Sequence, residues 1–364
     1  MQKFIGLITA NYSTKHPGIL AQTRPIASMP FLGRYRVLDF ALSNMVNSGA
    51  RTVGMIMPYN YRSIIDHIGS GRDWDLDRKK GGLFVLPGSA FGTSRTGSRF
   101  LLRDIAQNRA FLERTNSEYV VLSSSNFVMT INYNDIIAAH EAAGADITVV
   151  TKRATKVDAD VVGFTVENHR VRGVVHGIEF GDCAFLDCFV MARSLLLDML
   201  DWYAQSDYLD LFEAMADDYH HIHVHAYDFG GYVSAVFNKR SYFQSNMDLL
   251  NPEIIKELFP VDWPVRTKAH DNAPAKFESG SRVCNSRIAG SCRIYGTVTN
   301  SILGRGVIVK HGATVNDAII MQSCIIEQGA RVEHAIVDRN VHVPASVELR
   351  GTPDAIFVKE KKDY

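Results

Sequence analysis

The first two thirds of the chain alternate short apolar runs with segments of helical periodicity. The run FIGLITA at 4–10 is typical of a buried strand, and after it Leu38, Leu42, Met45 and Val46 recur at helical spacing. Further strands are predicted at 52–58, 83–87, 118–124 and 145–151, and further helices at 61–71, 101–114 and 134–144. Strands that alternate with helices favour a mostly parallel sheet covered on both faces. We therefore predict an α/β domain over 1–245.

From about Pro274 the pattern changes to single aliphatic residues that recur every six positions. Small and polar residues separate them, and helical periodicity disappears. The spaced pairs are Ile288 and Ile294, Ile302 and Ile308, Val309 and Val315, Ile326 and Val332, and Val341 and Val347. This period is the signature of a parallel β-helix in which each hexapeptide forms one flat side of a triangular coil. We predict a left-handed parallel β-helix of hexapeptide repeats over 276–364, after a proline-rich linker at 246–275. An irregular all-β domain is the alternative.

Composition and charge narrow the functional classes. Lys and Arg total 39 and Asp and Glu total 39, so the formal net charge is zero and gives no electrostatic basis for binding nucleic acid or an acidic membrane. No run approaches the roughly 18 apolar residues of a membrane helix. The five cysteines include no Cys-x-x-Cys pair, which indicates reduced thiols and a cytoplasmic protein.

The segment 30–68, PFLGRYRVLDFALSNMVNSGARTVGMIMPYNYRSIIDHI, resembles the glucose-1-phosphate adenylyltransferase (ADP-glucose pyrophosphorylase) family. That family has the pattern Gly-x-Tyr-Arg-ϕ-ϕ-Asp-Phe-x-ϕ-Ser-Asn. The stretches EYVVL, NDIIAAH and NSRIAGSCRIYGTVTNSIL fit equally well, so the similarity covers nearly the whole chain. It implies a Rossmann-like nucleotidyltransferase domain joined to a hexapeptide β-helix. It also implies a reaction in which ATP and glucose 1-phosphate give ADP-glucose and pyrophosphate, with Mg²⁺.

The loop that cradles nucleotide phosphates in this family is altered here. Aligned without gaps, the family's Ala-Gly-Gly-x-Gly-Thr-Arg-Leu falls on 10–17. Its three glycines and its arginine are replaced by Asn11, Tyr12, Thr14 and His16. A Cβ where only glycine fits bars close approach of phosphate, and histidine is mostly neutral at pH 7. We predict that this loop has lost its chemistry.

The positions that the family uses for metal and sugar phosphate are altered too. The family's Gly-Asp-His segment falls on 125–127, so Asn126 stands where Mg²⁺ requires a carboxylate. Phe185 replaces a small hydroxyl residue that touches the sugar phosphate, and 100–103 replace the family's Gly-Thr-Ala-Asp. We predict no catalytic residues, no metal and no cofactor, with the Mg²⁺ and ATP sites lost.

Three residues remain as candidates for ligand binding. Lys15 supplies a charge within the altered loop, and Arg24 matches a family arginine. Asp228, in YDFGG, matches a family metal aspartate, although a lone aspartate is more often a turn residue.

The losses identify the chain as similar to the second, non-catalytic (GlgD-type) subunit of Firmicute-type bacteria. The resemblance implies a hetero-oligomer, expected to be a tetramer, with a catalytic GlgC-type subunit, and modulation of that partner in glycogen biosynthesis. Neither nucleic acid nor membrane is an expected partner, and self-association of the chain alone stays open. An active glucose-1-phosphate adenylyltransferase with a rearranged site is the main alternative.

Several other features have simpler interpretations. A hexapeptide-repeat acyltransferase would need a catalytic histidine on the β-helix, and His311, His334 and His342 have no visible coenzyme site beside them. The basic run 78–80 could bind a phosphorylated effector but is typical of a solvated loop. The alternating histidines of 221–225 could chelate zinc but are more typical of a polar strand face.

Overall fold

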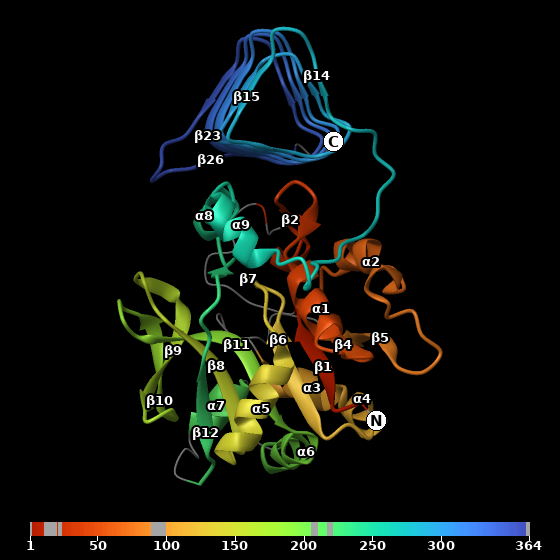
Figure 1. Cartoon of the computed structure of the whole chain (residues 1–364), viewed down its shortest axis with the longest axis vertical. Helices are drawn as coiled ribbons and strands as arrows, with labels where there is room; N and C mark the ends of the chain where they lie inside the picture. The colour runs from red at the N-terminus through yellow and green to blue at the C-terminus, as the bar shows by residue number, and fades with distance from the viewer. Residues whose placement is uncertain are drawn as a thin grey trace. The chain divides into compact units, whose positions relative to one another are not determined.

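The computed structural model describes residues 2–10, 20, 24–88, 100–204, 210–216 and 221–361. The chain folds into two compact units that interleave along the sequence (Figure 1). Unit 1 comprises Met1–His16, Leu38–Val233 and Val261–Arg266, and unit 2 comprises Pro17–Val37, Ser234–Pro260 and Thr267–Tyr364. This division differs from the sequential one into 1–245, 246–275 and 276–364, because short segments far from the β-helix in sequence pack with it.

Within the described residues, unit 1 contains a nine-stranded sheet in the order β5-β4-β1-β6-β11-β8-β12-β10-β9. The strands β1, β4, β5, β6, β8 and β12 are parallel, β11 runs antiparallel between β6 and β8, and β9 and β10 form an antiparallel pair at one edge. The bounds are β1 Phe4–Thr9, β4 Thr52–Met57, β5 Gly82–Pro87, β6 Tyr119–Ser124, β8 Ile147–Arg153, β9 Asp158–Glu167, β10 Arg170–Ile178, β11 Cys183–Ala192 and β12 Val224–Asp228. The mostly parallel α/β architecture predicted from the sequence is confirmed.

Helices pack on both faces of this sheet. The helices α3 (Leu102–Gln107), α4 (Arg109–Glu113), α6 (Arg193–Trp202) and α7 (Leu211–Ala216) cover a core that includes Ile5 and Leu7 of β1. The helices α1 (Leu38–Asn47) and α5 (Tyr133–Ala143) contact the sheet elsewhere. The remaining elements of this part of the chain are α2 Arg62–Ile68, η3 Arg72–Trp74, β7 Phe127–Met129 and β13 Val233–Ala235. None of the described helices is long and apolar enough to cross a membrane.

One predicted helix is divided in two. The segment 101–114 forms α3 and α4 with a break at Asn108, whose side-chain amide donates to the carbonyl oxygens of Asp104 and Pro87, each at 2.8 Å. The Asn108 side chain thus hydrogen-bonds to the backbone of α3 and connects the junction between α3 and α4 to the end of β5. Periodicity alone could not reveal this contact.

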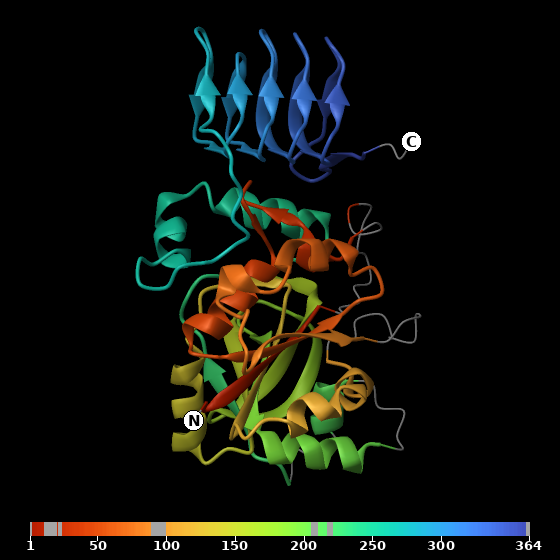
Figure 2. The ribbon, with the colours of Figure 1, turned by 90° about the vertical axis from the view of Figure 1, so that its right-hand side faces the viewer.

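The C-terminal part of unit 2 is a parallel β-helix of triangular coils, seen end-on in Figure 1 and side-on in Figure 2. Its strands are β14 Lys276–Phe277, β15 Arg282–Cys284, β16 Arg287–Ile288, β17 Arg293–Ile294, β18 Thr297–Thr299, β19 Ile302–Leu303, β20 Ile308–Val309, β21 Thr314–Ile320, β22 Ile325–Ile326, β23 Arg331–Val337, β24 His342–Val343, β25 Glu348–Arg350 and β26 Phe357–Lys359. Ile294, Val309, Ile326 and Val343 stack in register inside the coils, and each is 0% exposed. Successive partners in this column lie 15, 17 and 17 residues apart, which is short of three full hexapeptides and explains why the six-residue period wavers.

One outer face of the β-helix is covered within unit 2. Ile302, Ile319 and Ile336 alternate with residues of the coil interior, yet they are at most 3% exposed. Helix α8 (Lys239–Asp248) contacts β21, and the other elements of unit 2 outside the β-helix are η2 Ile26–Ser28, β2 Pro30–Phe31, β3 Tyr35–Arg36 and α9 Pro252–Leu258. Between β2 and β3, Gly33 has φ +71°, and a Cβ there would lie 2.7 Å from the carbonyl oxygen of Leu303. Aliphatic residues on an outer face lose contact with water when helices and turns pack over them, which ties these early segments to the coils.

Candidate functional site

The carboxyl ends of the parallel strands in unit 1 define the edge at which α/β sheets bind ligands. β1 ends at Thr9 and β6 at Ser124, and the two strands pair in register along their length. The backbone N–H of Ser125 donates to the carbonyl oxygen of Thr9 at 3.0 Å, so the end of β1 and the turn after β6 are held together. The loop that was predicted to have lost its chemistry follows β1 and lies outside the described residues. Its positions are Asn11, Tyr12, Thr14, Lys15 and His16. The prediction for that loop remains untested.

Asn126 lies in the turn between β6 and β7 and is 1% exposed. Its side-chain oxygen accepts a 3.4 Å hydrogen bond from the hydroxyl of Ser125, and its side-chain nitrogen is buried with no hydrogen-bond partner. Mg²⁺ binds oxygen ligands and favours carboxylates, whereas this position offers one neutral oxygen beside a buried donor. Among the described residues, no group of three or more His, Cys, Asp or Glu side chains could hold a metal ion. The Asn126 position therefore lacks the carboxylate that Mg²⁺ favours, and the loss of the Mg²⁺ site stays a prediction.

Asp228, the last residue of β12, is exposed. The backbone N–H of Phe229 donates to the carbonyl oxygen of Thr151 at 2.7 Å, and the ammonium of Lys152 donates to the carbonyl oxygens of Gly230, at 3.3 Å, and Gly231. The contact of Phe229 continues the pairing of β12 with β8, and Lys152 holds the segment after β12; neither contact uses the Asp228 carboxylate. Sequence reasoning did not foresee the part that Lys152 plays there.

Cys183, on β11, is not activated as a nucleophile. Burial raises the pKa of the Cys183 thiol against a weaker lowering by the positive charge of Arg153, and the carboxylates of Asp228 and Asp182 add smaller raising effects. A thiol with a raised pKa stays protonated at neutral pH and reacts poorly. All five cysteines are free.

An aromatic cluster occupies positions that the family resemblance aligned with substrate-contacting residues. Phe185 of β11 is 0% exposed, and its ring centroid lies 4.9 Å from that of Phe189 and 5.0 Å from that of Phe164. Phe100 is 3% exposed and meets Phe189 edge-on at 5.0 Å and Phe185 at 6.5 Å. Leu101 and Leu102 are each 4% exposed. Two stretches that were expected to contact substrate in an active relative thus form hydrophobic core here.

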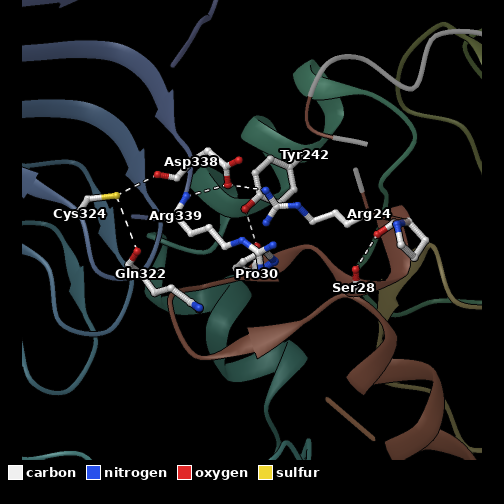
Figure 3. Close-up of polar contacts among 9 residues, drawn as sticks. Arg24, Ser28, Pro30, Tyr242, Gln322, Cys324, Asp338 and Arg339 are labelled. Atoms are coloured by element: carbon white, nitrogen blue, oxygen red, sulfur yellow. Dashed lines mark hydrogen bonds and ion pairs between the residues drawn. The ribbon is translucent and has the colours of Figure 1, made fainter. Parts of the chain in front are cut away.

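Arg24 is engaged within unit 2. Its guanidinium is buried and forms an ion pair with Asp338, which follows β23 (Figure 3). The Asp338 carboxylate also accepts from the backbone N–H of Arg339 at 2.7 Å, and the thiol of Cys324 donates to the Asp338 carbonyl oxygen at 2.9 Å. In the same view the hydroxyl of Tyr242 on α8 donates to the carbonyl oxygen of Pro30. These contacts favour a structural role for Arg24 over the ligand-binding role considered from the sequence.

Other features weighed from the sequence also have local partners. The side chain of Arg78 donates to the carbonyl oxygen of Asp75, and His342 lies 3.0 Å from the carboxylate of Glu327 on the β-helix surface. The ring of His225, on β12, stacks on that of His169 at 5.8 Å.

The fold and these positions together define a nucleotidyl transferase-type domain joined to a hexapeptide β-helix. The chain matches the nucleotidyl transferase family over residues 20–172 and the GlmU-like C-terminal hexapeptide family over residues 273–354. It is 32% identical to the glycogen biosynthesis protein GlgD of Bacillus subtilis over 349 residues, which is 94% of this chain and 91% of that protein. It is also 32% identical to the glucose-1-phosphate adenylyltransferase of Pseudothermotoga lettingae, over 86% of this chain and 77% of that enzyme. A GlgD protein of Geobacillus stearothermophilus is 32% identical over 86% of this chain and 83% of its own length.

The chain therefore belongs to the family of GlgD glycogen biosynthesis proteins and glucose-1-phosphate adenylyltransferases. The family resemblance inferred from the sequence is confirmed.

Proposed function

We propose that this chain is a non-catalytic regulatory subunit of a bacterial ADP-glucose-forming enzyme, and that it acts in the cytoplasm. In this proposal it assembles with a catalytic subunit of the same architecture and raises that subunit's activity in glycogen biosynthesis. One observation supports the proposal: Phe100 and Phe185, at positions that the resemblance aligns with substrate contacts, pack in a buried aromatic cluster.

The cluster opposes substrate binding on energetic grounds. A sugar phosphate placed against Phe185 would lose water from its charged group without gaining a hydrogen bond there, which is strongly unfavourable. Displacing a fully buried phenylalanine side chain would also cost about 3–5 kcal/mol, the usual penalty for removing such a ring from a core. The carboxamide of Asn126 at the metal position adds an independent obstacle.

An intact fold with altered substrate positions is suited to packing against a related chain. Similar subunits can replace one another in a symmetric oligomer because their contact surfaces are alike. Such a subunit can favour the active conformation of its partner, and a coupling free energy of about 1–3 kcal/mol changes apparent affinity by about 5–150-fold.

The test is an assay of ADP-glucose and pyrophosphate formation by this chain, by a catalytic subunit from the same organism, and by the two co-expressed. We expect no measurable synthesis by this chain alone, and a higher kcat or lower apparent KM for the mixture than for the catalytic subunit at equal concentration. An unrelated protein added in place of this chain controls for non-specific stabilisation. Robust turnover by this chain alone would support the active-enzyme alternative, and a mixture no better than its catalytic subunit would refute the proposal.

A further inference from the structure

Unit 1 contains a groove of about 270 Å³ between β5, at one edge of the sheet, and helix α4 (Figure 1). The end of β5 lies near Asn108, whose side-chain amide donates to the carbonyl oxygen of Pro87 at 2.8 Å. After α4 the chain passes Arg114 and reaches β6, which starts at the same edge of the sheet as β5 because these strands are parallel. The groove therefore extends from Asn108, at the end of β5, to Arg114, toward its start.

The middle of the groove is apolar. The rings of Phe84 on β5 and Phe111 on α4 pack with their centroids 5.4 Å apart, and Leu86 lines the groove beside them. Phe84 is 36% exposed, so part of its ring is open to solvent and can gain stability by contact with a further apolar group. Ala110 of α4 also lines this stretch, and its small side chain leaves the groove open.

The described lining of the groove contains one charged residue, Arg114, and no Asp or Glu. None of the ion pairs among the described residues includes Arg114. The carboxylate of Glu113, its neighbour in the chain, is instead paired with Arg109 at 2.7 Å. A guanidinium without a counter-charge at one end of an apolar groove favours a ligand that carries a carboxylate.

The edge of β5 offers little to an added peptide strand. Its alternate residues Leu83, Val85 and Pro87 direct their backbone groups away from β4, because the N–H of Gly82 donates toward β4. The N–H of Leu83 already donates to the carbonyl oxygen of Leu76 at 3.0 Å, and proline has no N–H. Strand addition depends on a row of main-chain hydrogen bonds, and β5 offers one remaining outward donor, at Val85. A small molecule is therefore the better occupant.

We propose that this groove binds a small aromatic carboxylate. Its ring lies against Phe84 and Phe111, and its carboxylate accepts hydrogen bonds from the guanidinium of Arg114. The stretch of β5 from Gly82 to Leu86 spans about 13 Å, which accommodates a ring with a short side chain. A volume of about 270 Å³ is slightly below the range of drug-sized ligand sites, which favours a ligand of this small size. Binding requires this chain alone and is independent of the proposed function.

Saturation-transfer NMR of the full chain tests the site, with 3-phenylpropionate as the probe. One control is 3-phenylpropan-1-ol, which keeps the ring and lacks the charge, and the other is propionate, which lacks the ring. We expect 3-phenylpropionate to bind with a Kd of about 1 mM or tighter, and its affinity to fall with added salt. The alcohol should bind about two- to fivefold more weakly, the effect of losing one exposed ion pair, and propionate should show no transfer.

Two pairs of variants locate the bound probe. Ala110→Leu fills the groove and should weaken binding at least about tenfold, whereas Ala106→Leu, at an exposed position of α3 outside the groove, is its matched control. Arg114→Gln should weaken binding of 3-phenylpropionate about two- to fivefold and leave binding of the alcohol unchanged. Arg103→Gln, at an exposed arginine of α3 outside the groove, should bind both compounds as the wild type does.

Several results would overturn the proposal. Wild-type affinity in Ala110→Leu would place the probe elsewhere on the chain, and an equal loss in Arg103→Gln would remove the assignment of the carboxylate to Arg114. Equal affinity for the alcohol and the carboxylate would contradict the class of ligand, and absence of transfer at about 10 mM probe would contradict binding itself. Thermal melts show whether each variant is folded. If Ala110→Leu does not fold, the comparison of Arg114→Gln with Arg103→Gln decides the outcome.

Discussion

Removing the charge of Asp338 should destabilise unit 2 strongly. Arg24 is 3% exposed and Asp338 is 7% exposed, so the ion pair between them is shielded from water. Asp338→Asn keeps the shape of the side chain and an acceptor for the backbone N–H of Arg339, but it leaves the Arg24 guanidinium buried without a counter-charge. The Nε of Arg24 already lacks a hydrogen-bond partner, so little remains to compensate that charge.

The expected magnitude follows from this burial. Removing one partner of a buried ion pair costs about 3–5 kcal/mol, because the remaining charge stays desolvated. In a unit of this size the loss corresponds to a fall in thermal midpoint of about 6–20 °C. The double variant Arg24→Met with Asp338→Leu should recover most of the stability, since an apolar pair of similar volume often replaces a buried ion pair without penalty.

Differential scanning calorimetry and urea unfolding of the full chain measure the effect. The matched control is Glu348→Gln, which disrupts the exposed pair of Arg331 and Glu348, whose charged atoms lie 3.5 Å apart and whose side chains are 70% and 56% exposed. An exposed pair of this kind contributes about 0.2–1 kcal/mol, so the control should change little. A loss in Asp338→Asn no larger than in the control, or a double variant less stable than the single one, would refute the reasoning.

Three further changes have expected outcomes. Gly33→Ala should cost about 1–3 kcal/mol in urea unfolding, because φ is +71° and the new Cβ would lie 2.7 Å from the Leu303 carbonyl oxygen; wild-type stability would contradict this. Phe185→Ser should lower stability by about 3–5 kcal/mol without creating ADP-glucose synthesis, so any gain of activity in the chain alone would argue against the proposed function. Burial lowers the pKa of His140, so between that value and the unfolded value of about 6.5 the unfolded state binds more protons and stability falls as pH falls. Urea midpoints at about pH 7.5 and about pH 5 should show this loss, and His140→Gln should reduce it; an unchanged pH dependence would contradict the assignment to His140.

Much of the architecture was determined by local pattern. The six-residue spacing of aliphatic residues, as between Val309 and Val315, predicted the β-helix, because the small and aliphatic side chains that fill stacked coils recur at a nearly regular interval. The alternation of apolar runs and helical segments predicted the parallel sheet for a similar reason, since both faces of each strand are buried. The family resemblance and the replacements at Asn126 and Phe185 were also visible in the sequence.

Only the tertiary structure decided which distant segments share a unit. Arg24 and Asp338 are separated by 314 residues, and no sequence pattern indicates that they form an ion pair, because an ion pair depends on the geometry that packing creates. The outward column of Ile302, Ile319 and Ile336 does not specify what covers it, since apolar burial is non-directional. The contact of Gly33 with the carbonyl oxygen of Leu303 is a similar case, because it forms only when the β2–β3 turn folds onto the coils.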